Sequence, residues 1–389
     1  MSERLVVRGR LEGAAEPMDI TIEDGRIRAI ARTGDAGGET VVGGRECLLC
    51  EAFLDIQVNG FATVDFNRPT LTAADLRRAL EAMWRHGVTQ LFPTVITAPL
   101  EAMLGTMKAI ARAREEDPAL RHAIPAIHLE GPFLAAEDGP RGAHPISSVR
   151  DPDWDVFQRL QEASGGLIGL VTLAPERSGA VELISRLRAA GLVVAIGHTD
   201  ASEADIDAAV QAGAQLSTHL GNGAHAALPR HRNYVQKQLA TDALMASLIA
   251  DGHHLPGYFV KNLIRCKGLD RVILITDAMA AAAAPPGTYR IGEVLAEVGP
   301  DGYVRLPGTP YLAGSALTMD RAVENTARFA GLSLWQAIGL ATRQPRRLFP
   351  SLEAGIAPGQ PADLVVLREG PPLTVEATLV EGELVYRHA

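Results

Sequence analysis

Eight short apolar segments recur through the middle of the sequence, and stretches with helical periodicity separate several of them. Continuous apolar runs of this length are typical of strands buried on both faces of a parallel sheet. Eight such units favour a (β/α)8 barrel over an open doubly wound sheet. Helices are predicted at residues 73–87, 203–213 and 255–268. The candidate strands are residues 53–58, 88–94, 124–130, 168–174, 192–198, 214–220, 245–252 and 271–277.

The two ends of the chain have a different pattern, in which short strands alternate with turns. Asp24-Gly25 is a hairpin signal near the start, and residues 355–359 form a turn-rich stretch before the final strands. Two β-rich ends around a different middle predict one small β-sandwich domain built from both termini. We therefore expect residues 1–52 and 355–389 in that domain, and residues 53–354 in the barrel.

Composition limits the partners and the location that we expect. The formal net charge is -9 and no long basic run occurs, so neither nucleic acid nor a membrane is an expected partner. The first residues lack the apolar core of a signal peptide, and no apolar run reaches membrane-spanning length. Three cysteines cannot form a disulfide framework, which favours a reducing compartment. These features predict a cytoplasmic protein.

Cys47 and Cys50 form a C-x-x-C motif, which raises the question of zinc or redox chemistry. No second C-x-x-C occurs, and the pair lies in an apolar stretch just before a predicted strand. A structural role is therefore the favoured interpretation.

Polar residues gather at the ends of the predicted strands, where a barrel places its active site. One glutamate and two histidines leave an open position for water, as in a catalytic zinc or iron site. Each residue alone has an ordinary explanation, such as a hydrogen-bonded core histidine or a helix-capping aspartate, but their joint placement favours a metal site. The strand-end residues are Gln57, Asn59, His128, Glu130, His198, His219, Asp251 and Asp277.

Several motifs resemble those of N-acetylglucosamine-6-phosphate deacetylases, which are members of the amidohydrolase superfamily. The resemblance extends over nearly the whole chain, and it implies hydrolysis of N-acetylglucosamine 6-phosphate to glucosamine 6-phosphate and acetate. The motifs are HLEGPF (128–133), GHT (197–199), THLGNGAH (218–225), IADGHH (249–254), ITDAM (275–279) and LAGSALTM (312–319).

The resemblance also implies the roles of the reacting groups. Glu130, His198 and His219 would bind one divalent metal ion per subunit, and Asp277 would be the general base and acid. His144 would help to polarise the acetyl carbonyl. Zinc is the first expectation for the metal, although iron, manganese and cobalt accept the same ligands.

On the substrate side, the resemblance assigns His254 to the sugar and Arg230 to the phosphate. Asn222 and Gly223 would contribute backbone groups that cradle the phosphate. In the family, the neighbouring subunit of a dimer commonly supplies this arginine. A homodimer acting on a small amino sugar is therefore implied.

Two departures from the family pattern affect these expectations. Many amidohydrolases carry H-x-H at the end of strand one, where this chain has Gln57 and Asn59, so one metal is expected rather than two. Both are expected on the substrate side, with Gln57 bonded to the metal-bound water. The family also usually has a bulky residue after THL and then N-A-M, where this chain has glycines at 221 and 223. Exposed arginines are often only solvated surface, so a non-phosphorylated N-acetyl sugar or another N-acyl amine stays an alternative substrate.

Other functions are also open. A deaminase or cyclic-amide hydrolase usually keeps H-x-H and often a bridging lysine, and neither is found at the expected places. A catalytically inactive barrel scaffold typically loses metal ligands, whereas this chain keeps Glu130, His198, His219 and Asp277. Residues 281–310 are predicted to form hairpins over the barrel mouth.

Overall fold

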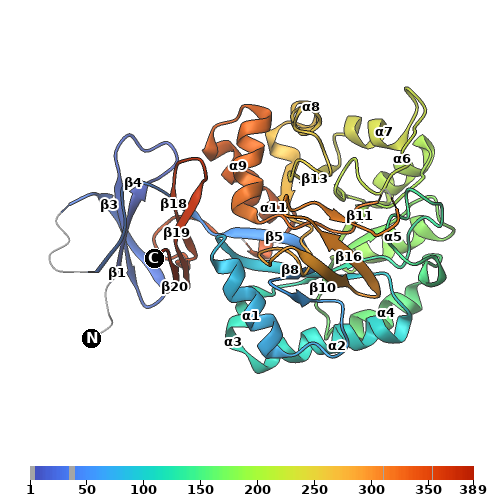
Figure 1. The fold of residues 1–389 in the computed structure, drawn as a ribbon, viewed down its shortest axis with the longest axis horizontal. Coiled ribbons are helices and arrows are strands. Elements are labelled where there is room, and N and C mark those ends of the chain that lie inside the picture. Colours follow the sequence, from blue (N-terminus) through green and yellow to red (C-terminus); the bar gives the residue numbers. More distant parts are fainter. Residues whose placement is uncertain (1–4, 35–39, 310, 353) are drawn as a thin grey trace.

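The computed structural model describes residues 5–34, 40–309, 311–352 and 354–389. A large barrel and a smaller sheet lie side by side along the long axis of the molecule (Figure 1). The first and the last strands of the described residues lie in the smaller sheet, and the middle of the chain forms the barrel. The fold is therefore the predicted barrel with a small β-sandwich.

The barrel is an eight-stranded sheet in the described part of the chain, and every neighbouring pair of its strands is parallel. Each strand overlaps one of the eight predicted from the sequence. The barrel closes between its last and first strands, where the Asp277 amide donates to the Gln57 carbonyl at 3.0 Å. In chain order the strands are β5 (Phe53–Val58), β8 (Val88–Ile96), β9 (Ile127–Glu130), β10 (Ile168–Leu173), β11 (Val193–Ile196), β12 (Leu216–Ser217), β13 (Met245–Ile249) and β14 (Val272–Ile275).

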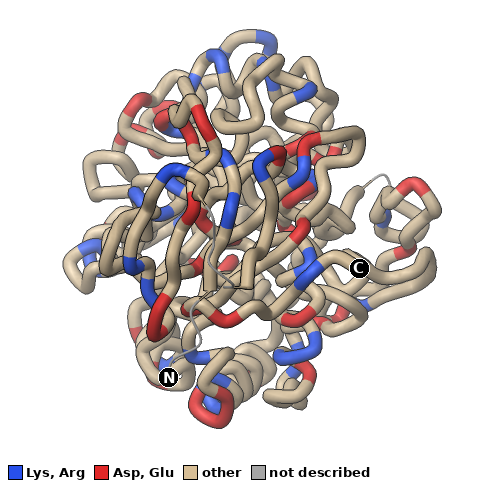
Figure 2. The backbone as a smooth tube through the Cα atoms, turned by 90° about the vertical axis from the view of Figure 1, so that its left-hand side faces the viewer, with Lys and Arg blue, Asp and Glu red and all other residues tan. Residues whose placement is uncertain are grey.

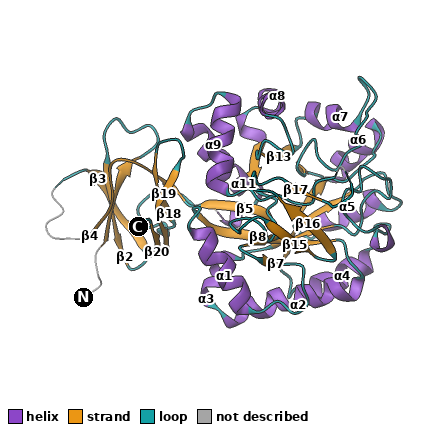
Figure 3. Ribbon diagram, viewed as in Figure 1, coloured by secondary structure: helices purple, strands orange, loops and turns teal. Residues whose placement is uncertain are grey.

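Helices surround these strands on the outside of the barrel (Figure 3). The first helix begins at Thr72, whose hydroxyl accepts the Asp75 amide while the Asp75 carboxylate accepts the Thr72 amide. Its apolar residues, including Leu76 and Leu80, are buried against the barrel. The helices are α1 (Ala73–Trp84), α2 (Leu100–Glu116), α3 (Pro118–Ala123), α4 (Trp154–Ala163), α5 (Ala180–Ala189), α6 (Glu203–Ala212), α7 (Tyr234–Ala240), α8 (Gly257–Lys267), α9 (Met319–Ala330), α10 (Leu334–Ala341) and α11 (Arg343–Leu348).

The small sheet has the order β20-β19-β18-β4-β1-β2-β3 among the described residues, so β4 and β18 join the two ends of the chain. The predicted hairpin is present, with Asp24 and Gly25 in the left-handed region at φ 50° and 76°. The domain boundaries after residues 52 and 354 stay a prediction. The strands are β1 (Leu5–Arg10), β2 (Met18–Glu23), β3 (Arg26–Arg32), β4 (Thr40–Glu51), β18 (Leu364–Arg368), β19 (Thr374–Val380) and β20 (Glu383–Arg387).

A third, three-stranded sheet lies within residues 281–310, as the predicted hairpins require. It consists of β15 (Gly287–Ile291), β16 (Val294–Val298) and β17 (Val304–Arg305), and its apolar side packs on Ile96 and Met279. The remaining elements are β6 (Gly60–Phe61), β7 (Val64–Asp65), η1 (Ile146–Ser148), η2 (Leu269–Arg271) and η3 (Pro350–Leu352).

Cys47 and Cys50 are free thiols buried in β4, and burial raises the pKa of Cys50 far above its usual range. Both belong to hydrophobic cores, which supports their structural interpretation. In Figure 2, which views the molecule from the side of the small sheet, basic and acidic residues are interspersed along the chain. Within the described ranges, no helix has the length and apolar character needed to span a membrane.

Candidate metal centre and substrate cavity

A cavity of about 320 Å³ opens at the ends of the barrel strands. Ile291 of β15 and Val294 of β16 form part of its wall, so the small third sheet borders the barrel mouth. Most of the residues predicted from the sequence also line it. They are Asn59, Glu130, His144, His198, His219, Asn222, Gly223, His254 and Asp277.

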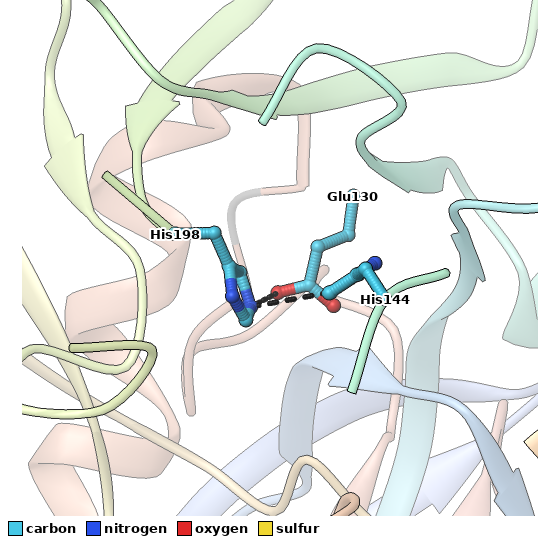
Figure 4. A group of neighbouring side chains, drawn as sticks. All are labelled: Glu130, His144 and His198. Atoms are coloured by element: carbon cyan, nitrogen blue, oxygen red, sulfur yellow. Dashed lines mark hydrogen bonds and ion pairs between the residues drawn. The ribbon is translucent and has the colours of Figure 1, made fainter. Parts of the chain in front are cut away.

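The predicted metal ligands converge at the base of this cavity. His219 Nε2 lies 3.1 Å from Glu130 Oε1 and 3.1 Å from His198 Nε2, and His198 Nε2 lies 3.4 Å from Glu130 Oε1. His144 Nε2 is 3.3 Å from His198 Nε2. Glu130, His144 and His198 offer ligand atoms that all lie within 4.8 Å of one another, and Figure 4 shows their side chains pointing toward one another. The chain thus has a buried Glu/His/His cluster that could bind a metal ion.

The chemistry of this cluster fits a cation. His198 Nδ1 lies 2.9 Å from the Pro140 carbonyl, which can only accept, so Nδ1 carries the proton and Nε2 presents its lone pair to the cluster. Burial alone would raise the pKa of Glu130, but its interactions with the neighbouring His198 and His219 rings hold that pKa well below its usual range. A carboxylate and imidazole nitrogens facing one point are the donor set that divalent metals prefer.

The backbone at this site is unusual for residues other than glycine. His198, His219 and Asp277 have φ angles of 49°, 30° and 50°, in the left-handed region. Each lies two residues after the end of a barrel strand. Such conformations cost roughly 1–3 kcal/mol each and gather at functional sites. Their coincidence supports a functional role for this end of the barrel.

Asp277 stands beside the cluster and is held by two amides. Asn59 Nδ2 donates to Asp277 Oδ1 at 2.7 Å, and Gln57 Nε2 donates to Asp277 Oδ1 at 3.1 Å and to Glu130 Oε1 at 3.0 Å. Burial and the Glu130 charge raise the pKa of Asp277. Gln57 is not among the described residues that line the cavity; its amide instead bridges the two carboxylates from below.

Of the residues predicted to bind the phosphate, Asn222 and Gly223 line the cavity and Arg230 does not. Asn222 lines it, but its backbone and side-chain N–H groups both donate to the His219 carbonyl, at 2.9 and 3.2 Å. Gly223 and Ala224 also line it, and no partner for their amides is found among the described residues. Arg230 is exposed and lies outside the cavity wall of its own chain.

Comparison with known proteins places this geometry in a family. The sequence profile described as the amidohydrolase family matches residues 44–385, which is most of the chain. The chain belongs to the amidohydrolase family. It is accordingly an enzyme that hydrolyses carbon–nitrogen bonds.

Individual relatives narrow the comparison. The amidohydrolase is 32% identical over 379 residues to an N-acetylglucosamine-6-phosphate deacetylase from Lysinibacillus sphaericus, with 96% and 94% of the two chains covered. It is also 32% identical over 378 residues to an N-acetylgalactosamine-6-phosphate deacetylase from Escherichia coli O157:H7, with 96% of each covered. A substituted N-acetyl-D-glucosamine-6-phosphate deacetylase from Mycobacterium smegmatis, solved with N-acetyl-D-glucosamine-6-phosphate, has a TM-score of 0.88 at 31% identity over 99% of both chains.

Two supporting interactions of this amidohydrolase site were not predicted from the sequence. Asp251 accepts His254 Nδ1 at 2.7 Å and the backbone amides of His253 and His254 at 2.9 Å each, so it fixes the direction in which the His254 ring faces the cavity. Arg141 donates to the His144 carbonyl at 2.8 Å and steadies the loop that carries His144. The IADGHH motif could have revealed the first of these interactions, since Asp251 lies three residues before His254.

His128, a strand-end candidate, lies below the cavity instead of on its wall. It is fully buried, its Nε2 is 2.8 Å from Thr172 Oγ1, and Thr172 Oγ1 is 2.7 Å from Thr218 Oγ1. Burial lowers the pKa of His128 to about 4, so its ring is neutral. In this amidohydrolase, His128 is a hydrogen-bonded core residue beneath the cluster.

Proposed function

We propose that this amidohydrolase removes the acetyl group of N-acetylglucosamine 6-phosphate, giving glucosamine 6-phosphate and acetate. The observation that carries the proposal is Asp277, a buried carboxylate with a raised pKa beside the Glu130, His198 and His219 cluster in one cavity. The relatives from Lysinibacillus sphaericus and Mycobacterium smegmatis are named as N-acetylglucosamine-6-phosphate deacetylases, which supports the same substrate.

Glu130, His198 and His219 would hold one divalent ion per subunit, with zinc favoured and iron, manganese or cobalt compatible with the same ligands. The short distances from His219 Nε2 to both other ligand atoms support it as the third ligand. When bound, the ion would polarise the acetyl carbonyl and make a water more acidic. The Gln57 amide donates to the carboxylates of both Glu130 and Asp277. A second cation between these two carboxylates would have to replace this amide, so the arrangement supports a single ion.

The chain's own groups then provide the proton transfers. Asp277 accepts a proton from the attacking water and passes it to the departing amine nitrogen, which is otherwise a poor leaving group. Asn59 and Gln57 hold the Asp277 carboxylate in place during both steps. The pKa of His144 is lowered to about 3 by burial and nearby His198, so its ring is neutral and can donate a hydrogen bond to the carbonyl oxygen as negative charge develops there.

The substrate side involves His254 for the sugar and the free amides of Gly223 and Ala224 for the phosphate. Asn222 shapes this segment through its two bonds to the His219 carbonyl. Arg230 is too exposed to serve its own cavity, which supports a homodimer in which Arg230 of the partner subunit completes the phosphate site. Three free cysteines fit a cytoplasmic location.

A second candidate substrate is the galactosamine epimer. The Escherichia coli relative named for N-acetylgalactosamine 6-phosphate is as similar as the glucosamine enzyme from Lysinibacillus sphaericus. The two sugars differ at one hydroxyl, so both fit the same reacting groups.

The test is steady-state deacetylation of both epimers, each with and without the 6-phosphate, by enzyme of measured metal content. A strong preference for N-acetylglucosamine 6-phosphate supports the proposal. A preference for the galactosamine epimer would replace the sugar, and equal rates without phosphate would point to a non-phosphorylated N-acetyl sugar or another N-acyl amine. No hydrolysis of any of them by metal-loaded protein would favour an inactive scaffold.

A further inference from the structure

The cavity lacks a permanent positive charge to balance a phosphate. Among the residues that the structure describes, its lining contains neither lysine nor arginine. His144, His198 and His219 face the metal cluster, and His254 is bonded to Asp251. One histidine of the lining, His225, belongs to neither group.

His225 follows the segment whose amides are free. Gly223 and Ala224 precede it directly, and their N–H groups have no partner among the described residues, so they can bind an anion. The backbone approaches the metal cluster closely here, because a Cβ on Gly223 would lie 2.7 Å from His198 Nδ1. The His225 ring therefore belongs to the same short loop that brings free amides to the cavity.

Tyr234, at the start of α7, determines how the His225 ring is turned. The buried Tyr234 hydroxyl accepts the His225 backbone amide at 2.8 Å and lies 3.0 Å from His225 Nδ1. Burial raises the pKa of Tyr234, so its hydroxyl keeps a proton to donate to Nδ1. Asp200 Oδ1 is also on this side, 3.7 Å from Nδ1. The Nδ1 edge thus faces Tyr234 and Asp200, which leaves Nε2 as the donor turned away from them.

We propose that His225 is a further substrate-binding residue, whose Nε2–H donates to the phosphate of the substrate together with the amides of Gly223 and Ala224. Tyr234 is its positioning residue. This inference rests on the proposed function, because it assigns a contact to the phosphorylated end of the same substrate. It also gives each chain a side-chain phosphate donor of its own, in addition to its backbone amides and to Arg230 of the partner subunit.

Two amide substitutions separate the nitrogens of the ring. The glutamine amide reaches about as far as Nε2, and the asparagine amide reaches only about as far as Nδ1. We expect His225→Asn to lower kcat/KM for N-acetylglucosamine 6-phosphate by about 10-fold, mainly through KM, and His225→Gln to lower it by less than about 3-fold. Tyr234→Phe should shift KM in the same direction by about 3-fold. His388→Ala, an exposed histidine at the small sheet, is the control and should have no effect.

A second experiment does not depend on turnover. Calorimetry measures the binding of inorganic phosphate to the metal-loaded full chain. We expect the asparagine variant to bind phosphate about 10-fold more weakly than the glutamine variant. Equal losses in the two variants, or equal losses of kcat/KM with and without the 6-phosphate, would overturn the inference. If the wild-type protein binds phosphate through His225 but hydrolyses no N-acetylated sugar phosphate, the proposed function fails while this contact stands.

Discussion

The cavity wall that carries Glu130, His198 and His219 differs in construction from the wall formed by residues 221–226. The first wall stands on the ends of buried strands, and its side chains contact one another within 3.4 Å. The second is a partly exposed loop with glycines at 221 and 223. A rigid wall suits bond breaking, which needs fixed distances. A loop can change with the substrate without disturbing that geometry.

The largest effect should come from Asp277→Asn on the rigid wall. We expect kcat to fall about 10³-fold, because an amide cannot accept the proton of the attacking water. Asparagine tolerates the left-handed backbone at this position, so the fold and the metal content should be kept. Single-turnover kinetics with metal analysis measure both quantities. Near-normal turnover would remove Asp277 from the role of base.

The second effect concerns the metal itself. His219→Ala removes one proposed ligand, and we expect weaker metal binding and about 10²-fold lower activity at a fixed metal concentration. Titration with zinc, followed by metal analysis and activity, tests this. His144→Ala is the matched comparison, because His144 Nε2 lies 3.3 Å from His198 Nε2, against 3.1 Å for His219 Nε2, but His144 is assigned to the carbonyl. If His144→Ala lost more metal than His219→Ala, His144 would be the metal ligand and His219 the residue at the carbonyl.

A smaller and more selective effect is expected at the loop. Arg230→Ala should raise KM for the phosphorylated sugar about 10-fold, because a charged hydrogen bond to phosphate is lost, and should change KM for the unphosphorylated sugar much less. The exposed Arg265 of α8 provides a control substitution outside the cavity. Equal increases for both sugars would mean that Arg230 does not recognise phosphate.

The smallest effect should appear where the two walls touch. Gly223→Ala would bring a Cβ within 2.7 Å of His198 Nδ1 at a backbone φ of 55°, so loop and ligand must both shift. We expect kcat to fall about fivefold for phosphorylated and unphosphorylated sugars alike, at roughly 1 kcal/mol of strain. A change in KM for the phosphorylated sugar alone would show that the loop moves without disturbing the ligand.

The rigid wall was largely predictable from the sequence, because a barrel brings the ends of its strands together. Reading Glu130, His198, His219 and Asp277 at those ends therefore located four side chains that the structure brings together. How deep each side chain lies within the barrel was harder to predict from the sequence. His128 is two residues before Glu130 on the same strand face, and nothing in the alternating pattern distinguishes the cavity layer from the layer below it.

The loop wall was harder to predict because its contacts join segments without periodicity. Gly221 replaces the family's bulky residue, and the structure shows why the smaller residue fits. Phe259 and Leu255 occupy the adjacent space, since a Cβ at Gly221 would lie 3.1 and 3.2 Å from their side chains. The contact between Tyr234 and His225 is likewise invisible in sequence, because both residues have other ordinary roles. The role proposed for Arg230 requires a dimer, which one chain does not specify.

The pairing of β4 with both β1 and β18 has a consequence for synthesis on the ribosome. The half of β4 around Leu49 pairs with Val366, which is translated roughly 300 residues later, or about 15–60 s at common elongation rates. During that interval the barrel can form while an apolar strand edge waits for its partner. Such edges pair readily with other chains. This edge of β4 can therefore be covered only after β18 has been synthesised.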